Sequence, residues 1–161
     1  MGSAGDHVPG MSSAALGFLA ILAGTAIAGQ AAANARLGVL LHSSILATGV
    51  AFFASLVVTL LGLAVLRTPL PDLDRVAAVP PYLWVAGGLM SAFGVGVFYW
   101  LIPQLGVSRV VAYALTGQLL LSMIASHLGW FQLPVVQISP MKLLGAACLI
   151  LGVGLIQGTT T

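Results

Sequence analysis

The chain has 161 residues, of which 60% are hydrophobic and only 5% are charged, and its formal net charge is +2. A soluble domain carries about 25% charged residues, so this composition excludes an ordinary water-soluble globule and predicts an all-α integral membrane protein. The five basic residues are spread singly along the chain and form no patch for a phosphate backbone, so no nucleic-acid partner is expected. Cys148 is the single cysteine, which excludes an intramolecular disulfide, and we expect neither a cofactor nor a metal.

Five apolar runs predict five transmembrane helices within one domain over residues 13–158. A polar tail over 1–12 precedes the domain, and its first ten residues are either native or a cloning addition. A short tail over 159–161 follows it. The last span is short for a hydrocarbon core of ~30 Å. The predicted spans cover residues 13–33, 45–66, 82–102, 109–127 and 141–156.

The first span ends in a sequence with two amides, GQAAANARLG, which begins at Gly29. Gln30 and Asn34 are four residues apart and therefore share one face of a helix. An amide inside an apolar layer needs a hydrogen-bond partner. The pair can lock two helices together by bonding to neighbouring backbone, or it can line a solute cavity, and both roles are compatible.

The second and third spans carry stripes of small residues. In the second span, which Ser43 or Ser44 can cap, one face holds small and hydroxylic residues that predict a close helix contact or a pathway lining: Thr48, Phe52, Ser55, Thr59 and Gly62. In the third, Gly88, Ala92 and Gly96 recur every four residues, which predicts a helix-packing ridge, and Trp100 continues the row. We expect Pro103 to end this helix and residues 104–108 to form a tight turn. The connection over 67–81 is predicted to be an aqueous loop, with room for a short interfacial segment.

The last two spans repeat the pattern of small and polar positions. Ala114, Gln118, Ser122 and Ser126 recur every four residues in the fourth span. Gln118 lies at mid-span, where its amide needs a partner, so the stripe lines a cavity or packs against another helix. In the fifth span, small residues at Gly145, Cys148 and Gly152 predict packing into a bundle or a dimer.

The basic residues give a weak orientation signal. With five spans, three basic residues, Arg67, Arg75 and Lys142, fall on one side, and two, Arg36 and Arg109, fall on the other. Cytoplasmic loops normally carry an excess of Lys and Arg, and three against two is nearly even. A chain that inserts both ways can form an antiparallel homodimer about an axis in the membrane plane.

Short motifs then occur in a specific order: GQAAANARLG, Pro103–Gly106, the sequence ALTGQL over 114–119, SHLG over 126–129, KLLG over 142–145 and GVG over 152–154. Together they resemble the small five-helix, YdcZ-like branch of the drug/metabolite transporter superfamily. The resemblance implies half of a ten-helix bundle, dual-topology homodimers or antiparallel heterodimers, and movement of small solutes across the bacterial cytoplasmic membrane by a multi-pass protein. One departure is Ser126, since members often carry an acid just before the equivalent of His127.

The polar groups of the spans favour recognition rather than catalysis. The three acids are Asp6, Asp72 and Asp74, all outside the spans, which disfavours proton-for-cation exchange on a membrane carboxylate. No enzyme activity is expected, because no span holds a catalytic pattern. We therefore expect a transporter that works as an antiparallel homodimer in contact with membrane lipid, the alternative being a non-catalytic partner subunit, such as half of a heteromeric carrier or a lipid-interacting protein. The predicted substrate-binding residues are Gln30, Asn34, Tyr99, Trp100, Tyr113, Gln118 and Ser122, and the predicted packing residues are Gly88, Ala92, Gly96, Gly145 and Gly152.

Overall fold

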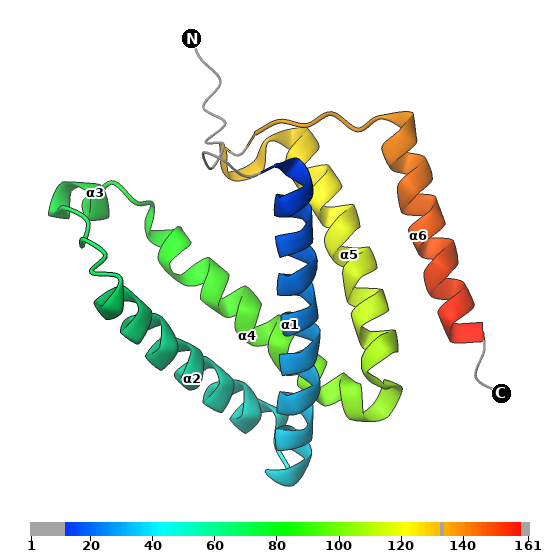
Figure 1. The fold of residues 1–161 in the computed structure, drawn as a ribbon, viewed down its shortest axis with the longest axis horizontal. Coiled ribbons are helices and arrows are strands. Elements are labelled where there is room, and N and C mark those ends of the chain that lie inside the picture. The colour runs from blue at the N-terminus through cyan, green and yellow to red at the C-terminus, as the bar shows by residue number, and fades with distance from the viewer. Residues whose placement is uncertain (1–11, 133, 159–161) are drawn as a thin grey trace.

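The computed structural model describes residues 12–132 and 134–158, and over these residues every regular element is a helix (Figure 1). The chain alternates in direction, so that α1 begins at the end of the molecule where α6 also begins, and α6 ends at the opposite end. The elements are α1 (Ser13–Leu40), α2 (Ser44–Val65), α3 (Leu73–Ala77), α4 (Pro81–Leu105), α5 (Val107–Leu128), the 3₁₀ helix η1 (Trp130–Gln132) and α6 (Pro140–Gly158).

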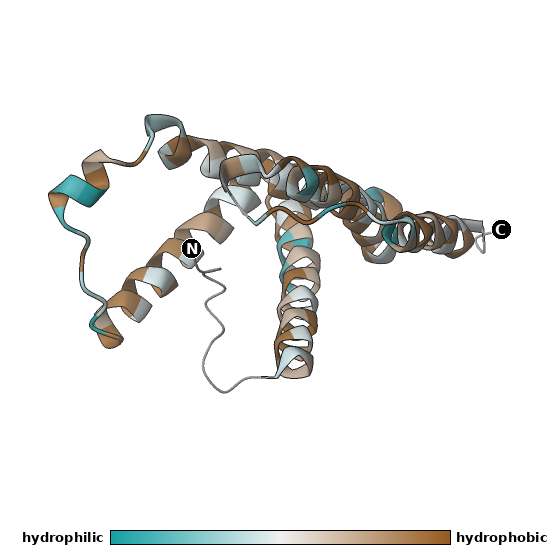
Figure 2. Ribbon diagram, turned by 90° about the horizontal axis from the view of Figure 1, so that it is seen from above, coloured by the Kyte–Doolittle hydropathy of each residue, from teal (hydrophilic) through white to brown (hydrophobic). Residues whose placement is uncertain are grey.

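Four of the described helices, α1, α2, α4 and α5, are long and apolar enough to cross a membrane. The apolar part of α6, Pro140–Ile156, is shorter than theirs. Most of the large hydrophobic side chains on these helices are exposed in the single chain, and Figure 2 shows the most hydrophilic stretch at α3. Such apolar surfaces are stable only against lipid or another protein, which agrees with a multi-pass membrane protein.

Two serines begin helices as expected for N-caps. The Ser43 hydroxyl accepts a hydrogen bond from the Leu46 N–H at 3.2 Å, so Ser43 is the cap of α2 and Ser44 is its first residue. The Ser12 hydroxyl accepts from the Ala15 N–H in the same way. The predicted span over 13–33 lies inside a longer helix, because α1 continues to Leu40, and Asn34 is therefore helical. Alanine-rich sequence favours this continuation.

The prediction that Pro103 ends a helix was wrong, whereas the predicted turn over 104–108 is present but shorter, because Gly106 is its only non-helical residue. Pro103 lies inside α4, which continues to Leu105, and Gly106 alone separates α4 from α5. A proline in the last turn removes only one N–H, whereas the reversal itself needs a special backbone conformation. Gly106 supplies it with φ 85° and ψ 153°, a region that is essentially restricted to glycine.

Replacing Gly106 with alanine is expected to lower the free energy of unfolding by roughly 1–3 kcal/mol, because alanine is strained in that conformation. The matched control is Gly87→Ala in α4, where an added Cβ meets nothing within 4 Å. That change should leave stability equal or raise it by up to about 1 kcal/mol. Thermal unfolding in detergent measures both variants, and equal melting temperatures would contradict the assignment of Gly106 as the reversal point.

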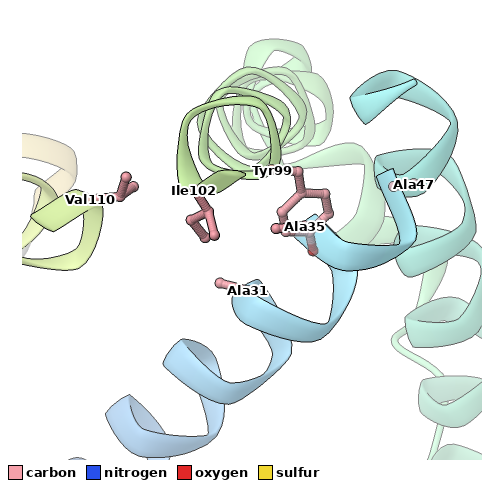
Figure 3. Close-up of a cluster of buried hydrophobic side chains, with 6 residues drawn as sticks. All are labelled: Ala31, Ala35, Ala47, Tyr99, Ile102 and Val110. Carbon is pink, nitrogen blue, oxygen red and sulfur yellow. The ribbon is translucent and has the colours of Figure 1, made fainter. Parts of the chain in front are cut away.

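The helices form an open arrangement around a small core. α1 packs against both α2 and α4, α2 also packs against α4, and α6 packs mainly against α5. Figure 2 shows α4, α5 and α6 in one layer, from which α1 and α2 project. The core lies where α1, α2, α4 and α5 meet (Figure 3), and the alanines in it allow close approach of the helix backbones. Its buried residues are Ala31, Ala35, Ala47, Tyr99, Ile102 and Val110.

Candidate functional site

A side-chain hydrogen bond joins α1 to α4 at the centre of the core. The Asn34 Nδ2 donates to the Tyr99 hydroxyl at 2.9 Å, across 65 residues of sequence. Tyr99 is only 2% exposed and Asn34 is half-buried. Asn34 can therefore hold two helices together, which is one of the two roles that the sequence allowed. Its hydrogen-bond partner is a side chain rather than the backbone.

An open groove of about 310 Å³ lies beside this bond, between α1, α4 and α5. Gln30 of α1 and Gln118 of α5 line it together with Ser91 and Tyr99 of α4, and we call it the amide groove. All the other residues that line it are apolar, and none of its lining residues is charged. Two amides and two hydroxyl-bearing residues therefore surround a space with uncharged walls, where each amide can both donate and accept hydrogen bonds.

A second open groove, of about 430 Å³, lies between α1 and α2, and we call it the hydroxyl groove. Gln30 and Asn34 line it from α1, and Ser55 and Thr59 line it from α2. The Thr59 hydroxyl donates to the Ser55 carbonyl at 2.8 Å, so its hydrogen is already used within its own helix. Gln30 belongs to both grooves, which makes it the polar residue common to the two spaces.

The stripe of small residues on α2 divides into two parts. Thr48, at the beginning of the helix, is 7% exposed and packs close to α4, where a Cβ built on Gly96 would lie 3.6 Å from its hydroxyl oxygen. Ser55 and Thr59 instead line the hydroxyl groove. The two interpretations of this face, packing and lining, each describe a part of it, because the buried residues of α2, Ala47 and Thr48, lie near its beginning.

Three of the predicted substrate-binding residues lie away from the amide groove. Trp100 is 59% exposed and lines a small hollow beside the turn between α1 and α2. Tyr113 is half-exposed on α5 and lines neither the amide groove nor the hydroxyl groove. Ser122 lines a different groove, between α5 and α6, and its hydroxyl donates to the Leu119 carbonyl at 2.8 Å. The structure thus brings together Gln30, Gln118 and Tyr99.

Sequence reasoning missed Ser91, which lines the amide groove from α4. The spacing between Ser91 and Tyr99 could have indicated it. The two residues are eight positions apart, and residues four or eight positions apart lie near the same face of a helix.

The predicted packing glycines behave differently from one another within the single chain. Only at Gly96 does another helix lie within contact distance of an added Cβ. At Gly88, Gly145 and Gly152 an added Cβ would meet nothing within 4 Å, and Ala92 is exposed. A packing role at these positions requires a partner outside this chain, and it stays a prediction.

The polar chemistry of the described helices is mostly uncharged. Among the described residues, no three His, Cys, Asp or Glu side chains are grouped closely enough to hold a metal ion. An ion pair joins Arg75 to Asp72 at 3.8 Å on the exposed α3, far from the grooves along the chain. The grooves themselves offer hydrogen-bond donors and acceptors beside apolar walls, which suits the recognition of a ligand.

Comparison with known proteins identifies one relationship. A family model described as "Putative inner membrane exporter, YdcZ", of the drug/metabolite transporter type, matches residues 15–155. No curated protein and no solved structure matches the chain. The match extends from the first turn of α1 into the last turn of α6, so it includes both grooves.

Proposed function

Because this chain belongs to the YdcZ family of multi-pass inner membrane proteins, we propose that it transports a small neutral solute that binds in the amide groove. The observation that carries the proposal is the position of Gln30 and Gln118, from two different helices, in one groove without charged residues. Amides in an apolar environment are costly unless they are hydrogen-bonded, so a solute with its own donors and acceptors would stabilise them. Asn34 and Tyr99 would support the wall of this groove.

We propose further that two copies form the transporter. Gln30 is exposed in the single chain and both of its grooves are open, so in a monomer the amide would face lipid. An amide without a hydrogen-bond partner in an apolar environment costs roughly 2–7 kcal/mol, which favours a cover supplied by a second chain. The 19 residues of α6 rise about 28 Å, close to the ~30 Å core, which supports α6 as a fifth span and ten spans for the dimer.

The two copies would be antiparallel, since the basic residues at the two ends of the helices are nearly balanced. We expect a reporter fused to the carboxyl terminus to be active on both sides of the membrane. The double variant Arg36→Gln/Arg109→Gln leaves three basic residues on one side of the membrane and none on the other, so it should insert in one orientation. A single orientation of the unchanged protein would contradict the antiparallel arrangement.

Uptake into proteoliposomes tests the function directly. We expect uncharged solutes to enter down their own gradients, while permanently cationic analogues of the same size enter no faster than into protein-free vesicles. The acids Asp72 and Asp74 lie at α3, outside the four long apolar helices, so dissipating a pH gradient should leave the initial rate unchanged. Uptake of cations alone, or uptake that requires a pH gradient, would contradict the proposal.

A second candidate is half of a heteromeric carrier. The open grooves favour it as well, because a different chain could cover Gln30 as effectively as a second copy. Uptake by the purified chain on its own would exclude this alternative. Strict dependence on a second, co-expressed protein would establish it.

A further inference from the structure

The largest of the grooves described lies between α5 and α6 and has a volume of about 540 Å³. It shares no lining residue with the amide groove. Its apolar lining includes Leu119 and Met123 of α5 and Ala146 and Leu149 of α6. The lining positions on each helix extend over eight residues, 119–126 on α5 and 142–149 on α6, so the groove runs for about 10 Å along the helix axes.

One end of this groove carries a positive charge. Lys142, in the first turn of α6, lines the groove where that helix begins, at an end of the helical layer (Figure 1). Its ammonium donates to the Gln137 carbonyl at 2.8 Å, which holds it beside the segment that connects α5 to α6. That segment is itself fixed on α5, because the Val136 N–H donates to the Ser126 carbonyl at 3.0 Å. An ammonium has three donors, so two remain for a ligand.

Among the described residues, no acidic side chain neighbours the Lys142 ammonium. Within the described part of the chain, the acids Asp72 and Asp74 lie at α3, on the opposite edge of the molecule from α6 (Figure 1). Asp72 already pairs with Arg75 there. An anion at Lys142 would therefore meet attraction that no described carboxylate offsets.

We infer that the groove between α5 and α6 binds an anionic phospholipid, with an acyl chain along the apolar walls and the phosphate at Lys142. The apolar lining matches a hydrocarbon chain better than a polar solute, since the Ser122 hydroxyl hydrogen is already used within α5. Lys142 lies near the beginning of α6, at the level where headgroups lie if α6 spans the membrane. Basic residues at that level attract anionic lipids.

Native mass spectrometry of the delipidated full-length protein tests the site with two probes, phosphatidylglycerol and phosphatidylcholine of the same acyl chains. We expect phosphatidylglycerol to bind about fivefold more tightly, which is the preference that one basic residue near the surface provides. Lys142→Gln should remove the preference. The matched control is Arg75→Gln, which neutralises an exposed basic residue on α3 and should keep it.

A second variant tests the groove rather than the charge. Gly145→Leu fills space that is open in this chain, so it should fold while reducing the binding of both lipids by about the same factor. Equal binding of the two lipids to the unchanged protein, or a preference that survives Lys142→Gln, would overturn the site. So would unchanged lipid binding by Gly145→Leu. Loss of the dimer in Gly145→Leu would also overturn it, because the groove would then be an interface between copies.

Discussion

Replacing Gln30 with leucine is expected to reduce the rate of solute uptake by about 5- to 150-fold while the protein still inserts and assembles. Among the described residues, Gln30 alone lines both the amide groove and the hydroxyl groove. Leucine keeps the approximate size of the side chain and the helix but removes both the donor and the acceptor. A buried polar group of the solute left unpaired costs about 1–3 kcal/mol, which lowers its occupancy by about 5- to 150-fold.

The measurement is the initial rate of uptake into proteoliposomes, with the dimer fraction followed by chemical cross-linking. Gln104→Leu is a matched control, because the Gln104 amide donates to the Trp100 carbonyl of its own helix at 2.8 Å and lines neither groove. It should transport at close to the original rate. If Gln30→Leu instead destroys the dimer, Gln30 locks the helices or the two copies together, and the recognition role is refuted.

Replacing Tyr99 with alanine is expected to lower the free energy of unfolding by about 3–5 kcal/mol, the usual cost of deleting a buried aromatic side chain. Tyr99 is 2% exposed and packs among residues of α1, α2, α4 and α5, so its removal leaves a cavity at the junction of four helices. It also leaves the Asn34 amide without its partner. Because few side chains are buried in this open fold, the loss of this one should be among the largest of any single substitution.

Two further variants separate the ring from the hydroxyl. Tyr99→Phe keeps the packing and loses only the bond to Asn34, so it should cost about 0.5–1.5 kcal/mol. Tyr82→Ala, at a tyrosine that is 56% exposed near the beginning of α4, is the control for loss of a ring outside the core. Thermal unfolding in detergent ranks all three. A melting temperature of Tyr99→Ala no lower than that of Tyr82→Ala would show that this junction does not stabilise the protein.

A double-mutant cycle with Asn34→Leu isolates the energy of the Asn34–Tyr99 bond itself. Since the two side chains lie in hydrogen-bond contact, we expect Asn34→Leu to cost less in the Tyr99→Phe background than in the original protein. Additive costs would mean that the bond contributes nothing to folding. Together with the Gln30 variant, the cycle distinguishes an amide that holds helices from one that holds solute.

Features that depend on local chemistry were predictable from the sequence. Hydropathy summed over a window predicts an apolar helix wherever it lies in the fold, so the membrane class and the long helices followed directly. Helix capping uses groups three residues apart, and Ser43 was therefore recognisable. The shared face of Gln30 and Asn34 followed from the period of the α-helix. The order of short motifs indicated the family, which the family model confirms over residues 15–155.

Features that depend on how helices cross one another required the tertiary structure. The bond between Asn34 and Tyr99 joins residues 65 positions apart, and no periodicity within one helix relates them. The same packing separates Trp100 from the amide groove and brings Ser91 into it. Local rules also competed at the end of α4, where the conformation of Gly106, rather than the ring of Pro103, ends the helix. Sequence periodicity specifies which residues share a helical face, whereas the face that each helix presents to its neighbours depends on packing among all of them.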